Sequence, residues 1–433
     1  MHTTHDLVIV GGGLAGLTAA AFATRAGATV KLLERSSHLG GRAHTIEVEG
    51  FDLDLGPHAL YRQGAGMSAL DALGVTPRGG APVVSGVGVR ADHIGPLPMG
   101  MWSLLTTSLL KGRGRWQFMG VMARLGRMET SRWSHTTWGT WLDDHFTAPD
   151  ARALMAAFGR LSTYTHAPDH ISAAVVLDQI RMGLGGVLYL DGGWRRLVDD
   201  LTASAGAGLE LHTGCGVTTI HGEAGAFEVE DRTGVRHRGR QLVLATGPGV
   251  VDSLMGTTYR TQLCPSKAAC LAVGMHTRGL SGAHFALGLD APMYLSEFTR
   301  AAKVAPADHA VVHVARYLSP TEDGPARNRV PGEDGHTDTL EGMLTRQHPH
   351  WRDHMVVKKR LGKMTVLPAI PMAISGGLAG RPEAHVAPGI TLAGDWVGPE
   401  GLLADAALAS GRAAATLALE ALNLDAAPRQ AVA

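Results

Sequence analysis

The sequence has few cysteines and no metal-binding motif. Its 433 residues include three cysteines and 22 histidines. Three cysteines are too few, and odd in number, for a disulfide framework, which indicates a reducing compartment. Neither the cysteines nor the histidines follow the spacing of common zinc sites. The sequence therefore predicts no disulfide framework and no metal site.

Excess charge and long apolar runs are also missing. The 39 Lys and Arg residues balance 39 Asp and Glu residues. Nucleic-acid binding requires clustered basic residues, so we expect no nucleic-acid partner. No run of 18 apolar residues is present to cross a bilayer, and Met1 to Asp6 lack the pattern of a signal peptide. We therefore expect a cytoplasmic protein, with peripheral contact as its only association with a membrane.

Glycine is the residue type in excess. It supplies 57 residues, about 13 % of the chain against a usual ~7 %. The first cluster, GGGLAG at 11–16, follows an apolar run at 7–10. An Ala-rich stretch to residue 26 and a second apolar run at 29–33 come next. This order predicts a strand, glycine turn, helix and strand, which is one βαβ unit.

The glycine turn predicts a dinucleotide-binding site. Gly11 allows a tight turn, Gly13 lets a pyrophosphate approach the backbone, and Gly16 lets the helix pack against the strand. The helix begins near Leu14, with its N-terminal amides facing the phosphates. Glu34 ends the second strand, where a carboxylate accepts hydrogen bonds from both ribose hydroxyls and disfavours a 2′-phosphate. The turn alone leaves both FAD and NAD open.

The remaining pattern predicts two interleaved domains. Apolar or alternating segments at 210–220, 226–231 and 241–246 indicate strands separated by turns. Between about 97 and 180 the pattern is mostly helical. A helix-rich segment between sheet-rich segments indicates that one domain interrupts the other.

Further motifs occur in a recognisable order. GGR at 40–42 is followed by GPH at 56–58, GGW at 192–194 and GD at 394–395, before a helical segment at 402–421. With the N-terminal glycine turn, these motifs resemble the flavin-dependent amine oxidase superfamily, which includes phytoene desaturases, protoporphyrinogen oxidases and monoamine oxidases. The resemblance covers nearly the whole chain and favours FAD over NAD.

The resemblance implies an α/β fold with two domains. A Rossmann-like, three-layer FAD-binding domain would be interleaved with a substrate domain of mixed β-sheet and a helical insertion at about 97–180. The segments of the FAD-binding domain would be 1–60, 190–260 and 385–425. Those of the substrate domain would be 61–189 and 261–384.

FAD would lie extended across the first domain. The resemblance implies that Arg42 contributes a cation between pyrophosphate and flavin and that Asp395 reaches ribityl or pyrophosphate oxygens. Val217 would hold the adenine edge through its backbone. A helix N-terminus at 402–404 would stabilise negative charge near N1 of reduced flavin. The implied cofactor-binding residues are Gly11, Gly13, Leu14, Ala15, Gly16, Glu34, Arg35, Gly41, Arg42, Gly56, Pro57, His58, Val217, Gly394, Asp395, Leu402, Leu403 and Ala404.

Few side chains are obligatory for hydride transfer to a flavin, because the protein mainly positions the substrate and excludes water. The resemblance makes Lys267 a candidate for the lysine that amine oxidases place near the flavin. His58 is a candidate for contact with flavin or substrate, and Trp396 for the cavity wall. Alternatively, Lys267 is a surface lysine, His58 is a structural imidazole, and Trp396 is a core residue. Tyr61 and Tyr164 are weaker cavity candidates.

The resemblance implies an FAD-dependent oxidoreductase that desaturates an apolar or partly apolar small molecule. An amine oxidase acting on a C–N bond is the alternative, although Ala406-Ala407 replaces the Gly-Ala pair common in that branch. A redox-inactive flavin-binding protein is the alternative from another class. The electron acceptor and the oligomeric state stay open.

An apolar segment at 97–110 precedes Lys111, Arg113 and Arg115. It resembles the segment through which desaturases receive apolar substrates at a membrane surface. A helix pair lining an apolar substrate tunnel or the core is the alternative.

Overall fold

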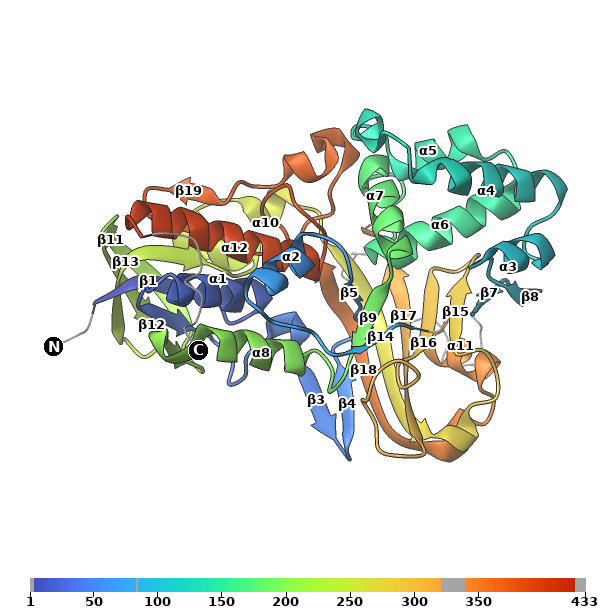
Figure 1. The fold of residues 1–433 in the computed structure, drawn as a ribbon, viewed down its shortest axis with the longest axis horizontal. Coiled ribbons are helices and arrows are strands. Elements are labelled where there is room, and N and C mark those ends of the chain that lie inside the picture. Colours follow the sequence, from blue (N-terminus) through green and yellow to red (C-terminus); the bar gives the residue numbers. More distant parts are fainter. Residues whose placement is uncertain (1–3, 83–84, 321–338, 425–433) are drawn as a thin grey trace.

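The computed structural model describes residues 4–82, 85–320 and 339–424. Two β-sheets lie toward opposite ends of an elongated molecule (Figure 1). Helices α1 and α12 lie against the first sheet, and a lobe of helices lies above the second (Figure 1). Segments from both ends of the chain meet in the first sheet.

The first sheet is built around the predicted βαβ unit. Strand β1 pairs in parallel with β2 on one side and with β13 on the other. β10 and β20 extend the parallel part, whereas β12 and β11 add an antiparallel hairpin. The strands are β1 (Thr4–Val10), β2 (Val30–Leu33), β10 (Leu209–His212), β11 (Val217–Glu223), β12 (Ala226–Asp231), β13 (Arg236–Leu244), β19 (His385–Ala387) and β20 (Ile390–Leu392).

Small residues allow the helices to pack closely on this sheet. A Cβ atom at Gly16 in α1 would lie 1.9 Å from the backbone oxygen of Gly11. One at Gly411 in α12 would lie 2.4 Å from the backbone oxygen of Ala15. Ala-rich faces of α1 and α12 therefore share one buried core with α8 and α2. The helices are α1 (Leu14–Arg25), α2 (Ala65–Ala72), α8 (Arg195–Ala205), α9 (Pro248–Met255), α10 (Tyr259–Gln262) and α12 (Ala404–Ala421).

The second sheet is mixed and mainly antiparallel. Its strand order is β18-β14-β17-β16-β15-β7-β8. Within the described part of this second sheet, β15 and β7 form the only parallel pair. Its strands are β7 (Val87–Val89), β8 (Ile94–Pro96), β14 (Ser266–His276), β15 (Phe285–Gly288), β16 (Met293–Glu297), β17 (His309–Leu318) and β18 (Met355–Leu367). The remaining strands are β3 (Thr45–Val48), β4 (Phe51–Asp54), β5 (Leu60–Tyr61), β6 (Gly79–Gly80) and β9 (Val187–Leu190).

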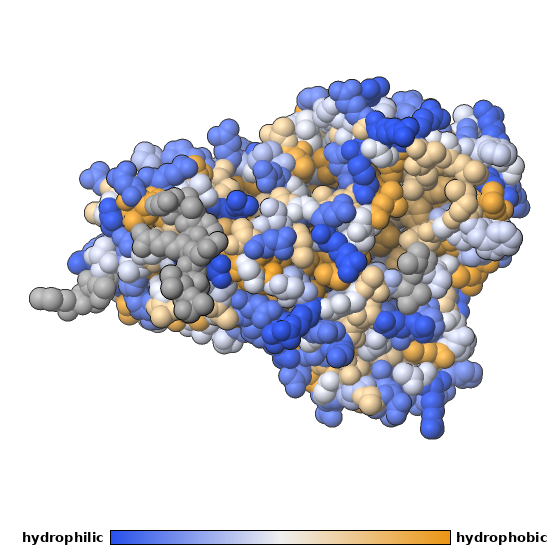
Figure 2. Space-filling view, in the orientation of Figure 1, coloured by the Kyte–Doolittle hydropathy of each residue, from blue (hydrophilic) through white to orange (hydrophobic). Residues whose placement is uncertain are grey.

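The helical lobe occupies the predicted insertion. Its helices pack through apolar faces on one another and on β14, β15 and β17. Hydrophilic residues cover much of the surface in Figure 2, and apolar surface is visible over the helical lobe. The helices of the lobe are α3 (Met101–Thr106), α4 (Gly112–Leu125), α5 (Trp138–His145), α6 (Pro149–Thr163) and α7 (Ala173–Leu184). α11 (Leu340–Gln347) packs on the second sheet.

The α/β fold class is confirmed, and one predicted strand is wrong. The segment 210–220 is two strands, β10 and β11, because Gly214 adopts a left-handed φ of 70° between them. The 241–246 strand begins earlier than predicted, at Arg236. The exact domain boundaries stay a prediction. Within the described residues, no helix is both long and apolar enough to cross a membrane.

Candidate functional site

One cavity of about 1050 Å³ extends from the first sheet to the second. The glycine turn, the ends of β2 and β13, the loop after β20 and the start of α12 line one part. Residues of β14, β17 and β18 line the other. Of the residues that the sequence proposed for cofactor binding, chemistry or the cavity wall, all border this cavity except Gly16, Leu402 and the weaker candidate Tyr61.

The glycines of the turn differ in what surrounds them. At Gly11, φ is 110° and an added Cβ would lie 2.4 Å from the backbone oxygen of Ala245. At Gly16 the clash is with Gly11, so this glycine serves packing and does not face the cavity. At Gly13 an added Cβ would meet only the backbone oxygen of Gly40, at 3.9 Å. The open side of Gly13 therefore faces the cavity.

Glu34 holds the glycine turn as well as bordering the cavity. One carboxylate oxygen accepts a hydrogen bond from the Gly12 amide at 2.6 Å, and the other accepts one from the Ser36 amide at 2.8 Å. The residue is 8 % exposed. Each carboxylate oxygen has a further lone pair, so the fixed carboxylate can still accept a hydrogen bond from a ligand.

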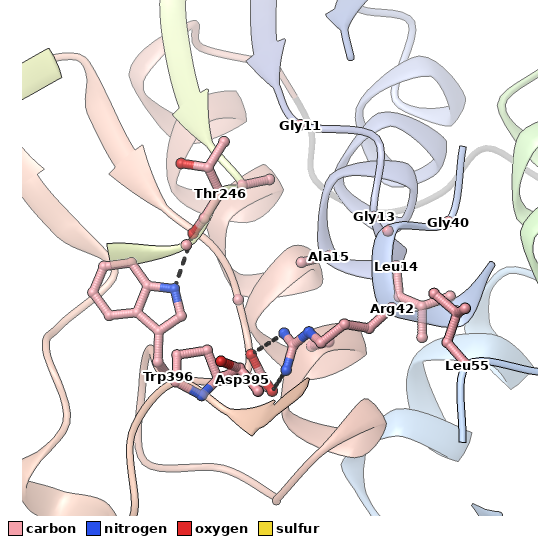
Figure 3. A pocket seen from close by; sticks show the side chains of 18 of the residues that line it. Gly11, Gly13, Leu14, Ala15, Gly40, Arg42, Leu55, Thr246, Asp395 and Trp396 are labelled. Carbon is pink, nitrogen blue, oxygen red and sulfur yellow. Dashed lines mark hydrogen bonds and ion pairs between the residues drawn. The ribbon is translucent and has the colours of Figure 1, made fainter. Parts of the chain in front are cut away.

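Arg42 and Asp395 form a two-point ion pair across the cavity wall (Figure 3). The two guanidinium nitrogens donate to the two carboxylate oxygens at 2.7 and 2.6 Å. Arg42 also donates to the backbone oxygen of Val366. Burial opposes the charge on Arg42, but the adjacent carboxylate outweighs it and raises the pKa of the guanidinium. The resemblance gave these residues separate roles, whereas the structure joins them.

Two helix N-termini point at the cavity. Leu14 and Ala15 begin α1, and Leu403 and Ala404 lie at the start of α12; all four line the cavity. Leu403 has a φ of 58°, a conformation that costs a non-glycine residue about 1–3 kcal/mol. Leu402 is fully buried beneath this turn and does not reach the cavity. Unpaired amides and the helix dipole make both N-termini suited to negative charge.

His58 borders the cavity as a partly buried, hydrogen-bonded imidazole. Its Nδ1 lies 2.8 Å from the backbone oxygen of Gly56, and its ring centroid lies 5.1 Å from that of Trp194. Burial lowers the pKa of His58, although the nearby Asp54 carboxylate opposes this shift. The imidazole is therefore held neutral at pH 7, and the structural alternative fits its hydrogen bond.

Lys267 and Trp396 lie on different walls. Lys267 is half-buried near the start of β14 and lines the cavity, so it is not simply a surface lysine. Trp396 is 1 % exposed, and its indole nitrogen donates to the backbone oxygen of Thr246 at 3.0 Å (Figure 3). The centroid of its ring lies 5.3 Å from that of Tyr259. Trp396 is therefore a core residue that also borders the cavity.

The structure adds apolar residues that the sequence did not indicate. Cys270 and Met364, from the adjacent strands β14 and β18, line the cavity near Tyr164 at the end of α6. Tyr164 was a weak candidate, and its φ of 52° turns the chain sharply at that point. The hydroxyl of Tyr61 donates instead to the backbone oxygen of Ser162, outside the cavity lining. Alternation within strands could have marked the buried faces, but not which face meets a cofactor.

Two buried polar atoms on the cavity wall lack partners. The hydroxyl of Thr246 and the indole nitrogen of Trp194 make no hydrogen bond to any described residue. Leaving a buried donor or acceptor unpaired costs about 1–3 kcal/mol. These atoms therefore mark positions at which a polar ligand would be stabilised. Trp194 belongs to the GGW motif, and Thr246 ends the segment 241–246 that the sequence predicts as a strand.

A family model described as an NAD(P)-binding Rossmann-like domain matches residues 9–72. A carotenoid 3,4-desaturase of Haloarcula japonica is 54 % identical over 52 residues, covering 12 % of this chain and 10 % of that protein. A protein of Mycobacterium tuberculosis named as a flavin-containing monoamine oxidase is 29 % identical over 251 residues, covering 53 % and 54 %. The chain thus spans about half of one curated relative and a tenth of the other.

Solved structures extend the likeness to the complete described fold. Cyclohexylamine oxidase from Brevibacterium oxydans matches with a TM-score of 0.71 and 14 % identity, covering 97 % of this chain and 100 % of that one. The TM-score shows a shared fold, and with 14 % identity the likeness shows the fold alone. The chain therefore shares the fold of this amine oxidase, and the resemblance predicted from the sequence is confirmed. The proteins it matches are oxidoreductases.

Proposed function

We propose that this chain is an FAD-dependent oxidoreductase that desaturates an apolar or partly apolar small molecule. The observation that supports this most is the continuous cavity that joins the glycine turn to the second sheet. Its volume of about 1050 Å³ slightly exceeds the roughly 300–1,000 Å³ typical of ligand pockets. Bound there, the flavin would accept a hydride from the substrate at N5.

The residues present fit such a cofactor. Gly13 offers open backbone, the α1 N-terminus offers amides, and Arg42 offers a cation for a pyrophosphate. Glu34 offers acceptors for a ribose. The N-terminus of α12 would stabilise negative charge on a reduced flavin ring. The unpaired hydroxyl of Thr246 lies on the same wall.

The second sheet would position the substrate and exclude water. Cys270, Ala268, Ala315 and Met364 form an apolar wall beside Tyr164. Burial raises the pKa of the Cys270 thiol to about 12, so this thiol stays protonated and contributes apolar surface. Neutral His58 adds no charge to the wall. Such a lining favours an apolar substrate, which the named desaturase relative also uses.

Oxidation of an amine is the second candidate, and the position of Lys267 favours it. This lysine borders the same cavity as Tyr164 and Trp396, so a basic group and aromatic rings face one space. Several structural neighbours are named as amine oxidases. The missing Gly-Ala pair at Ala406-Ala407 argues for the desaturase branch.

The test begins with the purified, full-length chain. We expect a yellow protein that releases FAD on denaturation; a colourless protein would contradict the cofactor assignment. Anaerobic mixing with polyenes, porphyrinogens and amines should bleach the flavin absorption band only with the apolar compounds. Reduction by amines alone would select the alternative. A bound flavin that no substrate or chemical reductant reduces would indicate a redox-inactive binding protein.

We further propose that the helical lobe touches a membrane surface while receiving substrate. Met101, Trp102 and Trp116 are 71 %, 79 % and 72 % exposed on α3 and α4. Lys111 and Arg113 lie between them in the chain, as expected for contact with anionic headgroups. Exposed tryptophans and basic residues together favour an interfacial position.

A further inference from the structure

A cysteine, an aspartate and a histidine meet at the hairpin end of the first sheet. Cys215 lies in the loop before β11, Asp231 ends β12, and His237 lies near the start of β13. Asp231 and His237 are 7 % and 6 % exposed. The three come together because the β12–β13 hairpin folds back beside the loop that follows β10.

The distances between their ligand atoms suit one metal ion. The Cys215 sulfur lies 3.1 Å from Asp231 Oδ2 and 3.7 Å from His237 Nε2. His237 Nε2 lies 3.1 Å from the same carboxylate oxygen. Tetrahedral zinc with Zn–S near 2.3 Å and Zn–N or Zn–O near 2.0 Å places such atoms about 3.3–3.6 Å apart. Shifts of a few tenths of an ångström therefore complete three corners of a tetrahedron.

The surroundings hold the carboxylate in position. Asp231 Oδ1 accepts hydrogen bonds from the Thr233 amide at 2.8 Å, the Thr233 hydroxyl at 2.6 Å and the Val235 amide at 3.2 Å. These bonds leave Oδ2 directed at Cys215 and His237. Hydrogen bonds that orient a ligand in this way raise metal affinity by roughly 10–100-fold.

The donor set also selects the metal. Thiolate, imidazole and carboxylate match zinc among common cellular ions, whereas magnesium and calcium prefer oxygen alone. A divalent ion with one thiolate, one carboxylate and one neutral imidazole forms a centre with no net charge, which a mostly buried position favours. Without the ion, burial and the adjacent carboxylate raise the pKa of the Cys215 thiol to about 12.

We infer that Cys215, Asp231 and His237 bind a zinc ion, with water at the fourth position. The ion would fasten the loop before β11 to the β12–β13 hairpin. Gly216 of that loop and Val217, the first residue of β11, line the cavity. The Cys215 amide donates to the backbone oxygen of Glu34 at 2.8 Å. The site thus supports the part of the cavity beside the end of β2.

Metal content of the flavin-loaded protein tests the site. After incubation with zinc chloride and desalting, we expect about one zinc per wild-type chain by mass spectrometry. We expect C215S and H237Q to retain less zinc than the wild type, by roughly tenfold or more. C264S, which alters another partly buried cysteine, is the matched control and should bind zinc normally. Absence of zinc from the wild type, or undiminished zinc in C215S, would overturn the inference.

A second measurement avoids any folding defect in the variants. Cobalt(II) added to the wild-type protein should produce a thiolate-to-cobalt charge-transfer band, and zinc should abolish that band. Zinc should also slow alkylation of Cys215, followed by peptide mass spectrometry, without slowing that of Cys264. Cobalt binding without the charge-transfer band would exclude Cys215 as a ligand and overturn the site.

Discussion

The guanidinium of Arg42 and the carboxylate of Asp395, 353 positions apart in the chain, form a two-point ion pair at 2.6 and 2.7 Å. The pair links the loop after β2 to the loop after β20, so it fastens the start of the chain to its end. The Arg42 side chain is 43 % exposed, whereas that of Asp395 is 3 % exposed. The carboxylate is thus fixed within the protein and the guanidinium reaches toward the cavity.

Replacing Arg42 with lysine should weaken cofactor binding more than it weakens the fold. Lysine keeps the charge but cannot donate two parallel hydrogen bonds. We expect FAD affinity of the apoprotein, measured by fluorescence titration, to fall about tenfold or more. The control is R132K, in an ion pair with Glu129 whose side chains are 59 % and 73 % exposed. Unchanged affinity in R42K would remove Arg42 from the proposed site.

Alanine at Gly13 and at Gly16 should separate cofactor binding from folding. Gly13 has a φ of −79°, which alanine adopts freely, and its Cβ would project into open space. G13A should therefore fold with a Tm near that of the wild-type apoprotein but retain little FAD. G16A places a Cβ 1.9 Å from a backbone oxygen, an overlap that costs about 1–3 kcal/mol or more.

Thermal unfolding and FAD content of the same preparations check this pair of variants. A G13A protein with normal FAD content would contradict the proposed approach of the cofactor to the turn. A G16A protein with unchanged Tm would show that α1 can shift away from the sheet at no cost.

Acid should destabilise the fold through His313. This residue of β17 is 1 % exposed, and burial, assisted by nearby His58, lowers its pKa to about 3. Because the unfolded chain holds this proton near pH 6.5 and the folded chain does not, stability falls as pH drops from about 6.5 toward 3. At pH 5.5 the loss from this one group is about 1.4 kcal/mol.

Urea unfolding at pH 7.5 and 5.5 measures this loss. In H313Q the difference between the two pH values should shrink by about 1.4 kcal/mol, whatever the variant's stability at pH 7.5. H221Q, at an exposed position on β11, should leave the difference unchanged. Equal pH dependence in H313Q and the wild type would show that His313 titrates normally.

Lys267 distinguishes the two proposed chemistries. In a desaturase, K267M should lower flavin reduction by the apolar substrate less than about tenfold, because hydride transfer needs no base at this position. In an amine oxidase, a lost general base or positioning group costs roughly 10²–10⁴-fold. K358M, on β18 and paired with Glu341, is the control. Stopped-flow reduction under anaerobic conditions gives the rates.

Flotation with vesicles tests the membrane contact. We expect the wild-type chain to float with vesicles containing anionic lipid, and the W102S/W116S double variant to float several-fold less. L184S changes another exposed apolar residue, 64 % exposed at the end of α7, and is the matched control. Absence of flotation by the wild type, together with activity independent of detergent, would contradict the contact.

The sequence by itself located the half of the cavity that is proposed to bind the cofactor. The glycine turn, Glu34, the GGR and GPH motifs and the terminal GD motif each carry a local backbone requirement, so short segments are sufficient to recognise them. All five border the cavity. The break between β10 and β11 was missed because apolar alternation continues across Gly214, and only its left-handed backbone ends the strand.

Tertiary structure alone decided the half of the cavity beside the second sheet and the side-chain clusters. Cys270, Met364 and Tyr164 face one space because β14, β18 and the end of α6 pack together, and no spacing along the chain encodes that meeting. For the same reason, the sequence could not predict that Cys215 lies beside Asp231 and His237. Nor could it predict that Arg42 pairs with Asp395. A short motif can be recognised in the sequence because the backbone geometry that it requires involves only neighbouring residues. A cavity wall cannot be recognised in this way, because it is formed by packing between segments that are distant in the chain.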